Sequence, residues 1–250
     1  MADIYFSGQG TVYVADRDVN GAITVFRDVG NVPALKVSLE TDILEHKESR
    51  TGQRLTDLRL VKERRSKVTM TLENFSKANL MMLMYGTSST PGSGSATNEI
   101  FPTVVLGDIV SLAHILVSSL VITDSTGSPL TLALGTNYTV DVNSGMVTMK
   151  VVSGFVQPFK AAYTYVATEI VPFFKAPSKE RFLKFAGLNT ASSDKPVIVE
   201  LYRVVFDPAG NIDLINDELA QFEIEGSVLY DETRDASAAL GGFGRIIQAP

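Results

Sequence analysis

The side chains that most often carry catalysis or bind metals are few in this chain of 250 residues, and they are not spaced to act together. The chain has no cysteine, so it has neither disulfides nor thiol chemistry. His46 and His114 are far apart in the sequence, and neither is accompanied by the residues that a metal site or a serine-type triad needs. Each histidine is therefore expected to be structural.

The segment 207–218, DPAGNIDLINDE, comes closest to a metal-binding pattern. Its acidic residues partly match a calcium loop, but Ala209 replaces a ligand and Ile212 replaces the glycine of the sharp turn. Asp-Pro and Gly-Asn favour an ordinary turn here. None of the glycine-rich stretches has the strand-turn-helix setting of a phosphate loop. The sequence predicts no enzyme activity, no cofactor and no metal site.

Charge is distributed unevenly along the chain. Its net charge is −6, yet the segment 47–67 carries eight basic and three acidic residues. The segment 207–235 carries nine acidic residues and one basic residue. Solvated surfaces explain such separation in many proteins, but opposite patches also fix the register between copies of one chain. The basic segment lacks aromatic residues for stacking on bases, which favours a structural contact over a nucleic-acid groove.

Composition is that of a globular protein, with 45% hydrophobic and 20% charged residues. No basic region followed by an apolar run stands at the N-terminus, so no secretory signal is expected. The most apolar stretch, 109–123, is shorter than the ~20 residues of a membrane helix. We therefore expect a soluble protein made in a cytoplasm.

Alternating apolar and polar residues predict strands in the first third of the chain. Asn20-Gly21 divides two β-prone runs within 11–29, as in a hairpin. Apolar residues recur at every second position in 35–43, which indicates a strand with one polar face. In 67–73 the same pattern predicts that Val68, Met70 and Leu72 point inward. A polar loop, 46–53, separates the two long strands.

A helix and a break in composition follow. Ser76 is a suitable N-cap for KANLMMLMY, which Gly86 would end, with Leu80, Leu83 and Met84 as its packed stripe. The segment 86–98 is predicted to be a flexible loop. The strand-rich block 100–168 is predicted to be a small inserted β domain, and residues 1–99 and 169–250 the main domain.

The order of these elements resembles the tail tube (major tail) proteins of long-tailed, siphovirus-like bacteriophages. The resemblance is carried by GNVPALKVSLETDILEHKES, KVTMTLENFSKANLMMLMYG, ERFLKFAGLN, VELYRVVFDPAGNIDL and FEIEGSVLYD. GTNYTVDVNSGMVTM is similar to a β-turn phrase of phage tail proteins. The likeness covers the first and last thirds, and it implies an all-β fold of two packed antiparallel sheets, a sandwich or barrel, with a flanking α-helix.

The resemblance also implies an assembly. Six copies would join their sheets into a ring, and stacked rings would form a hollow tube in the tail of the virion. The tube would enclose a tape-measure protein during assembly, meet a tail terminator and distal tail proteins at its ends, and conduct double-stranded DNA without binding it specifically. No membrane is involved, and the protein would be made in the host bacterial cytoplasm.

Two groups of residues are candidates for roles in such a tube. The predicted inter-ring contact loop contains His46, Lys47, Glu48, Arg50 and Arg54. An acidic lumen wall would repel DNA and keep it sliding, whereas a basic wall would hold phosphates. The candidates for that wall are Glu40, Asp42, Glu45, Glu223 and Glu225.

Other structural roles stay open at this point. The tube protein of a contractile injection system or a tail terminator would have a similar pattern of elements. A β-sandwich adhesin or receptor-binding protein is a further possibility, and it would be a monomer or trimer with an exposed aromatic patch.

Overall fold

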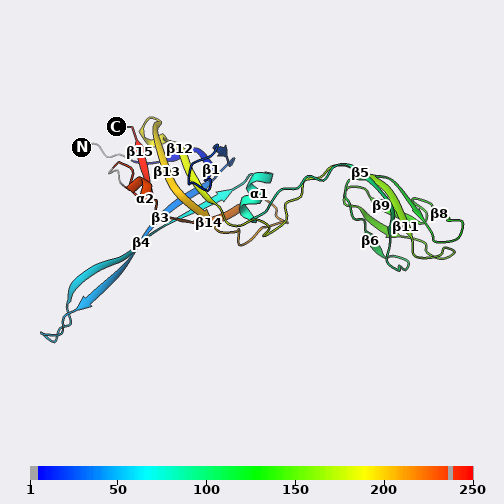
Figure 1. Ribbon diagram of the computed structural model, residues 1–250, viewed down its shortest axis with the longest axis horizontal. Coiled ribbons are helices and arrows are strands. Elements are labelled where there is room, and N and C mark those ends of the chain that lie inside the picture. The colour runs from blue at the N-terminus through cyan, green and yellow to red at the C-terminus, as the bar shows by residue number, and fades with distance from the viewer. Residues whose placement is uncertain (1–4, 236–238, 250) are drawn as a thin grey trace. The chain divides into compact units, whose positions relative to one another are not determined.

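The computed structural model describes residues 5–235 and 239–249, which form two compact units (Figure 1). The first unit contains the described residues up to Thr87 and those from Val171 onward, and the second contains Ser88–Ile170. The block 100–168 lies within the second unit. That unit begins earlier because β5 (Gly94–Ile100) pairs with β11 (Lys160–Tyr165). The prediction of a flexible loop over 86–98 is therefore wrong from Gly94 onward, since tertiary pairing outweighs a weak local strand preference.

The first unit is built on one antiparallel sheet of eight strands. Its order is β2-β1-β12-β13-β14-β4-β3, and β15 pairs with β13. The elements of this unit are β1 (Gly8–Asp16), β2 (Arg27–Asp28), β3 (Ala34–Lys47), β4 (Thr56–Leu72), α1 (Lys77–Leu83), β12 (Glu180–Asn189), the short 3-10 helix η1 (Thr190–Ser192), β13 (Lys195–Phe206), β14 (Phe222–Val228), α2 (Glu232–Asp235) and β15 (Gly244–Gln248). The predicted all-β class with a flanking α-helix is confirmed, and no barrel closes among the described residues.

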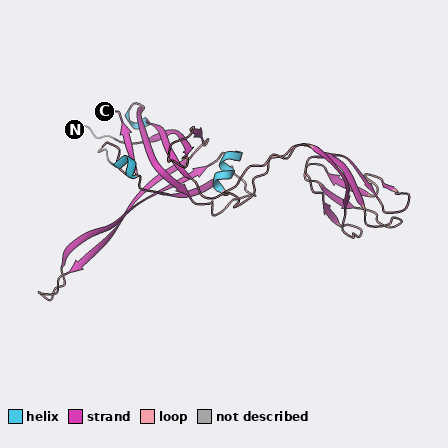
Figure 2. Ribbon diagram, in the orientation of Figure 1, coloured by secondary structure: helices cyan, strands magenta, loops and turns pink. Residues whose placement is uncertain are grey.

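One face of this sheet carries the core of the first unit. Val68, Met70 and Leu72 of β4 are fully buried, as their alternation predicts. Phe222, Ile224 and Val228 of β14 and Val12 and Val14 of β1 belong to the same cluster. The opposite face of β14 alternates to exposed polar residues. The sheet therefore has one buried, apolar face and one exposed, polar face. Figure 2 shows its strands in magenta and the helices of the chain in cyan.

Helix α1 packs against the same core. The Ser76 side chain accepts a hydrogen bond from the backbone N–H of Asn79, so the predicted N-cap is confirmed. The buried residues of the helix are Asn79, Met82 and Leu83. The prediction is thus confirmed for Leu83, whereas Leu80 and Met84 are only partly buried. The helix begins at Lys77, and its rotation on the sheet is set by the buried Asn79 amide, which donates to Val29 O at 2.8 Å and to Asn74 O at 2.9 Å.

The predicted hairpin at Asn20-Gly21 is only partly present. Gly21 has a φ of +79°, as a tight turn requires, and Asp18 accepts hydrogen bonds across the turn from Asn20 N and Ala22 N. The returning strand, β2, has just two residues. Val19 and Val25, which precede this short strand, are exposed.

The second unit has two small sheets around a core of its own. One has the order β6-β10-β9 and the other β5-β11-β7-β8. The remaining strands are β6 (Ile109–Ser111), β7 (Val117–Thr123), β8 (Thr131–Leu132), β9 (Tyr138–Asp141) and β10 (Met146–Met149). The cluster includes Ile122, Tyr138, Val147 and Phe159, all buried. Within the described residues, no helix is long and apolar enough to cross a membrane.

Candidate functional site

The hairpin formed by β3 and β4 is the most unusual feature of the first unit. The two strands pair from Ala34 and Thr71 to Lys47 and Thr56. The neighbouring strand β14, however, pairs with β4 only between residues 66 and 72. Residues 56–65 of β4 and their partners on β3 therefore extend beyond the sheet by about 30 Å, at ~3.4 Å per residue. Figure 1 shows this arm leaving the body of the unit.

Apolar side chains on the hairpin are exposed. Leu39 is 82% exposed, although its alternation with polar neighbours predicts a buried face. The other large apolar residues exposed on the hairpin are Val37, Leu44, Leu55, Leu58, Leu60 and Val61. An isolated exposed leucine is ordinary, but exposed apolar residues on both faces of one projecting hairpin favour an interaction with another surface.

The ends of the sheet are open as well. The outer edge of β3 has no strand partner among the described residues, and β2 covers β1 only at Tyr13 and Val14. A cavity of about 630 Å³ is lined by residues from both ends, including Gly8, Val12, Leu35 and Val37. Exposed backbone N–H and C=O groups on such edges are templates for pairing with another chain.

The structure places the predicted contact loop at the free end of the hairpin. His46 and Lys47 belong to β3, so the turn spans residues 48–55 and lies two residues later in the chain than the predicted loop 46–53. The Glu48 carboxylate accepts hydrogen bonds from Thr51 and from Arg50 N, and these bonds lower its pKa. The tip is thus internally braced.

Basic side chains at the tip point to solvent. Lys47, Arg50 and Arg54 form no side-chain hydrogen bond or ion pair within residues 5–235 and 239–249. His46 differs, since its Nδ1 lies 2.6 Å from a carboxylate oxygen of Asp57. The three unpaired cations are therefore free to meet an external acidic surface, whereas His46 braces the two strands.

The acidic candidates for a lumen wall fall into separate places. Glu223 and Glu225 are on the polar face of β14, and their neighbours on β4 are Thr71 and Thr69. Glu40 lies 3.8 Å from Lys67 across the β3–β4 pair, which partly neutralises it.

Asp42 and Glu45 lie farther out, on the projecting part of the hairpin. Strand alternation puts Asp42 on the same side as Glu40 and Glu45 on the opposite side. Glu45 also approaches Arg59 at 4.0 Å. The structure therefore brings Glu40, Glu223 and Glu225 to one face of the sheet, and it does not bring Glu45 there.

The two histidines have different surroundings, neither of which is a metal centre. His114 is in the second unit, where it stacks on Tyr165 with ring centroids 3.6 Å apart, and its Nδ1 lies 3.0 Å from the Tyr163 hydroxyl. His46 is exposed on the hairpin with Asp57. No group of three or more His, Asp or Glu residues suited to a metal ion occurs in the described part of the chain.

Two functional features were missed by sequence reasoning. The first is the exposure of Leu39 and the other hairpin apolar residues. Strand alternation indicates which side chains share a face, but it does not show whether anything covers that face. The second is a basic cavity beside α1, whose charged residues come from distant segments. No local sequence signal points to it.

A family model described as "Protein of unknown function UCP028589" matches residues 5–247. A comparison with curated proteins finds no match. The match spans both units, so the inserted block and the sheet that flanks it belong to a single family pattern.

Proposed function

The chain belongs to the family of proteins of unknown function UCP028589, and we propose that it is a tail tube protein of a long-tailed bacteriophage. Six copies form a ring, and stacked rings form the hollow tail tube. The proposal rests on the resemblance in element order together with the properties of the sheet and its hairpin. The tube conducts the genome during ejection and encloses the tape-measure protein during assembly.

The observation that carries the proposal is the uncovered β3–β4 hairpin. Its exposed apolar side chains and the open edge of β3 are costly to leave in water and invite aggregation. A closed ring of identical subunits removes such edges, because each copy covers the next. The arm projects about 30 Å beyond the sheet, which makes it available for contact with another copy.

The polar face of the sheet supports an open channel. Exposed Glu223 and Glu225 on β14 alternate with buried apolar residues, so the same strands present a core on one side and carboxylates on the other. In a ring, that face lines the lumen. Carboxylates repel phosphates and let DNA slide. Lys36 and Lys67 on the adjoining strands moderate the negative charge.

The tip of the hairpin is proposed as the contact between rings. Its unpaired Lys47, Arg50 and Arg54 meet an acidic surface of the next ring. Tail terminator and distal tail proteins cap the ends of the tube, which resides in the virion after synthesis in the bacterial cytoplasm.

Negative-stain electron microscopy of the purified protein tests this function. Hollow tubes of uniform width are the expected result. A triple variant, Lys47→Glu, Arg50→Glu and Arg54→Glu, should give rings or single subunits without tubes, because like charges then oppose stacking. The matched control is Lys47→Arg with Arg50→Lys and Arg54→Lys, which keeps the charge and should keep the tubes.

Two results would count against the proposal. A wild-type protein that stays monomeric at high concentration would contradict the ring. Tubes of normal length in the charge-reversed variant would contradict the role of the hairpin tip, while leaving the tube itself in place.

A further inference from the structure

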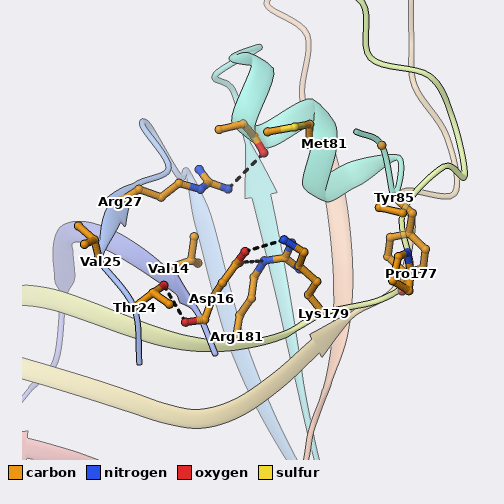
Figure 3. Close-up of a pocket in the computed structure, with 13 residues that line it drawn as sticks. Val14, Asp16, Thr24, Val25, Arg27, Met81, Tyr85, Pro177, Lys179 and Arg181 are labelled. Atoms are coloured by element: carbon orange, nitrogen blue, oxygen red, sulfur yellow. Dashed lines mark hydrogen bonds and ion pairs between the residues drawn. The ribbon is translucent and has the colours of Figure 1, made fainter. Parts of the chain in front are cut away.

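A cavity of about 270 Å³ lies between β1, β2, α1 and the start of β12 in the first unit (Figure 3). Its charged lining residues are Arg27, Lys179, Arg181 and Asp16, so three cations face one carboxylate. Val14, Val25 and Met81 supply apolar walls. This excess of positive charge is notable in a chain whose net charge is −6.

Asp16 is fully engaged by two of the cations. Lys179 Nζ lies 3.0 Å from Asp16 Oδ2, and Arg181 Nε lies 3.0 Å from Asp16 Oδ1. Burial alone would raise the pKa of Asp16, but the hydrogen bond from Lys179 and the charge of Arg181 lower it. The carboxylate is therefore ionised at neutral pH, and it offsets only part of the positive charge.

Arg181 has hydrogen-bonding capacity to spare. Its side chain is 11% exposed, and only Nε meets Asp16. Within the described residues, the two terminal nitrogens of its guanidinium have no hydrogen-bond partner. Burial lowers the pKa of Arg181 and the charge of Asp16 raises it, with a net lowering. The side chain is thus a buried cation with donors available to the cavity.

Among the residues that the structure describes, Arg27 has no carboxylate partner. Its Nη1 donates to Asn79 Oδ1 at 2.7 Å, and Nη2 is 3.4 Å from Ala78 O. The Asn79 amide is itself held by two backbone carbonyls, so its oxygen must face Arg27. Burial and repulsion from Arg181 lower the pKa of Arg27. Neutral acceptors thus position this cation beside the cavity without neutralising it, at least within the described residues.

From this arrangement we infer that the cavity binds an oxyanion, a carboxylate or phosphate group held by Arg27, Arg181 and Lys179. Guanidinium groups bind both ligands through paired N–H donors. An oxyanion would offset the excess positive charge, which is otherwise buried at a cost. The nearby apolar walls accommodate the carbon atoms that bear the charged group.

The chain itself offers a source of carboxylates. The loop between β13 and β14 contains Asp213, Asp217 and Glu218, none of which forms a side-chain bond within the described residues. Leu214, Ile215 and Leu219 in the same loop are almost fully exposed, Ile215 to 98%. This acidic, apolar segment complements a basic cavity with apolar walls.

The acidic loop does not line the cavity of its own chain. Ala209 N donates to Leu83 O at 2.8 Å, and Gln221 Nε2 donates to Glu73 Oε1 at 2.9 Å, which anchors both ends of the loop and leaves its middle outside. A second copy therefore supplies the carboxylate, through Asp217 or Glu218. This source rests on the proposed tube, whereas the oxyanion site does not.

The site is tested first by titrating potassium phosphate into the monomeric protein at constant ionic strength. Binding is followed by NMR chemical shifts. Lys179→Gln removes one exposed cation without altering the core. Arg27→Gln removes the guanidinium that has no carboxylate partner among the described residues. Both should weaken phosphate binding at least tenfold. Lys150→Gln makes the same change in charge in the second unit, and it should leave phosphate binding unchanged. Equal phosphate responses in all four proteins would overturn the site.

The source of the oxyanion is tested with a synthetic peptide of residues 211–221. We expect it to bind the wild type and to compete with phosphate, and its Asp217→Asn, Glu218→Gln form to lose binding at least tenfold. If phosphate binds but the peptide does not, the inference that a second copy supplies the carboxylate is wrong. Both titrations use the monomeric protein, so their results do not depend on tube formation. Absence of tubes would contradict the proposed function but not the oxyanion site.

Discussion

The edge strands of the second unit are short, whereas the first unit ends in a long one. In the second unit β6, β8 and β9 have three, two and four residues, and even β5 has only seven. In the first unit the edge strand β3 has fourteen residues, and its side chains are mostly exposed. Short edges protect a domain against pairing with other chains. The second unit therefore offers only short edges for such pairing, whereas the first leaves a long edge strand exposed.

The connection between the two units fits this difference. Ser89 and Ile170 form reciprocal backbone hydrogen bonds where the chain enters and leaves the second unit. Tyr85 O accepts from Ala176 N at 2.7 Å on the side of the first unit. The chain therefore enters and leaves the second unit through two segments that lie side by side, as an inserted domain requires. Experiments can test whether the second unit is stable by itself and whether assembly depends on the open edge and hairpin of the first unit.

Removing the projecting part of the hairpin should have the largest effect. Asp42 and Glu63 are opposite one another, so an Asn-Gly turn can replace residues 43–62. Assembly should be abolished, because the projecting apolar residues and basic tip are gone. The melting temperature of the first unit should change little, since its core is untouched. Sedimentation velocity measures assembly, and calorimetry measures the melting temperature. Full assembly of the truncated chain would show that the hairpin is not needed for assembly.

Truncation of core side chains should affect each unit separately. Leu72→Ala in the first unit and Met149→Ala in the second each remove a fully buried side chain. Each should cost about 2–5 kcal/mol of unfolding free energy. Calorimetry should show that only the transition of the mutated unit moves. Leu39→Ala is the matched control: it should shift stability by less than ~0.5 kcal/mol but weaken assembly. A single joint transition would contradict independent units.

Acid should weaken the second unit through Asp124. Its buried carboxylate accepts hydrogen bonds from Leu130 N at 2.7 Å, Thr126 Oγ1 at 2.7 Å and Val156 N at 3.2 Å. Burial raises the pKa of Asp124, but these bonds outweigh it and lower the pKa to about 2.

A lowered folded-state pKa adds stability above the unfolded value of ~3.9, and this is lost as the pH falls toward about 2. Asp124→Asn should therefore destabilise the second unit at pH 7, and the difference from wild type should narrow between pH 4 and pH 2. Urea unfolding at several pH values measures this. A difference that stays constant across that range would show that the carboxylate charge is not involved.

Excision of the second unit should have the smallest effect. Replacing residues 88–170 with a short Gly-Ser linker should leave the melting temperature of the first unit within a few degrees of its original value. Tubes should still form, since the open edge and the hairpin belong to the first unit. Loss of folding or assembly would show that the second unit is part of the tube wall. Electron microscopy and calorimetry distinguish these cases.

The sequence alone was sufficient for the features that depend on local spacing. Alternation identified Val68, Met70 and Leu72 as core residues, and the position of Ser76 identified the start of α1. These succeed because a strand repeats every two residues and a helix cap needs a specific side-chain oxygen. The absence of cysteine likewise needs no structure.

Tertiary structure alone decided the features that depend on what lies next to a strand. Residues 94–98 were predicted to be part of a loop, but they belong to β5 (Gly94–Ile100), because β11 pairs with that strand. Leu39 has the spacing of a core residue, yet it is exposed because it lies on β3, the outermost strand, where no further strand of the described chain flanks it. Arg27, Lys179 and Arg181 converge on one cavity only because the sheet brings β1, β2 and β12 together. Spacing along a chain fixes the direction of a side chain, whereas its neighbours are set by packing.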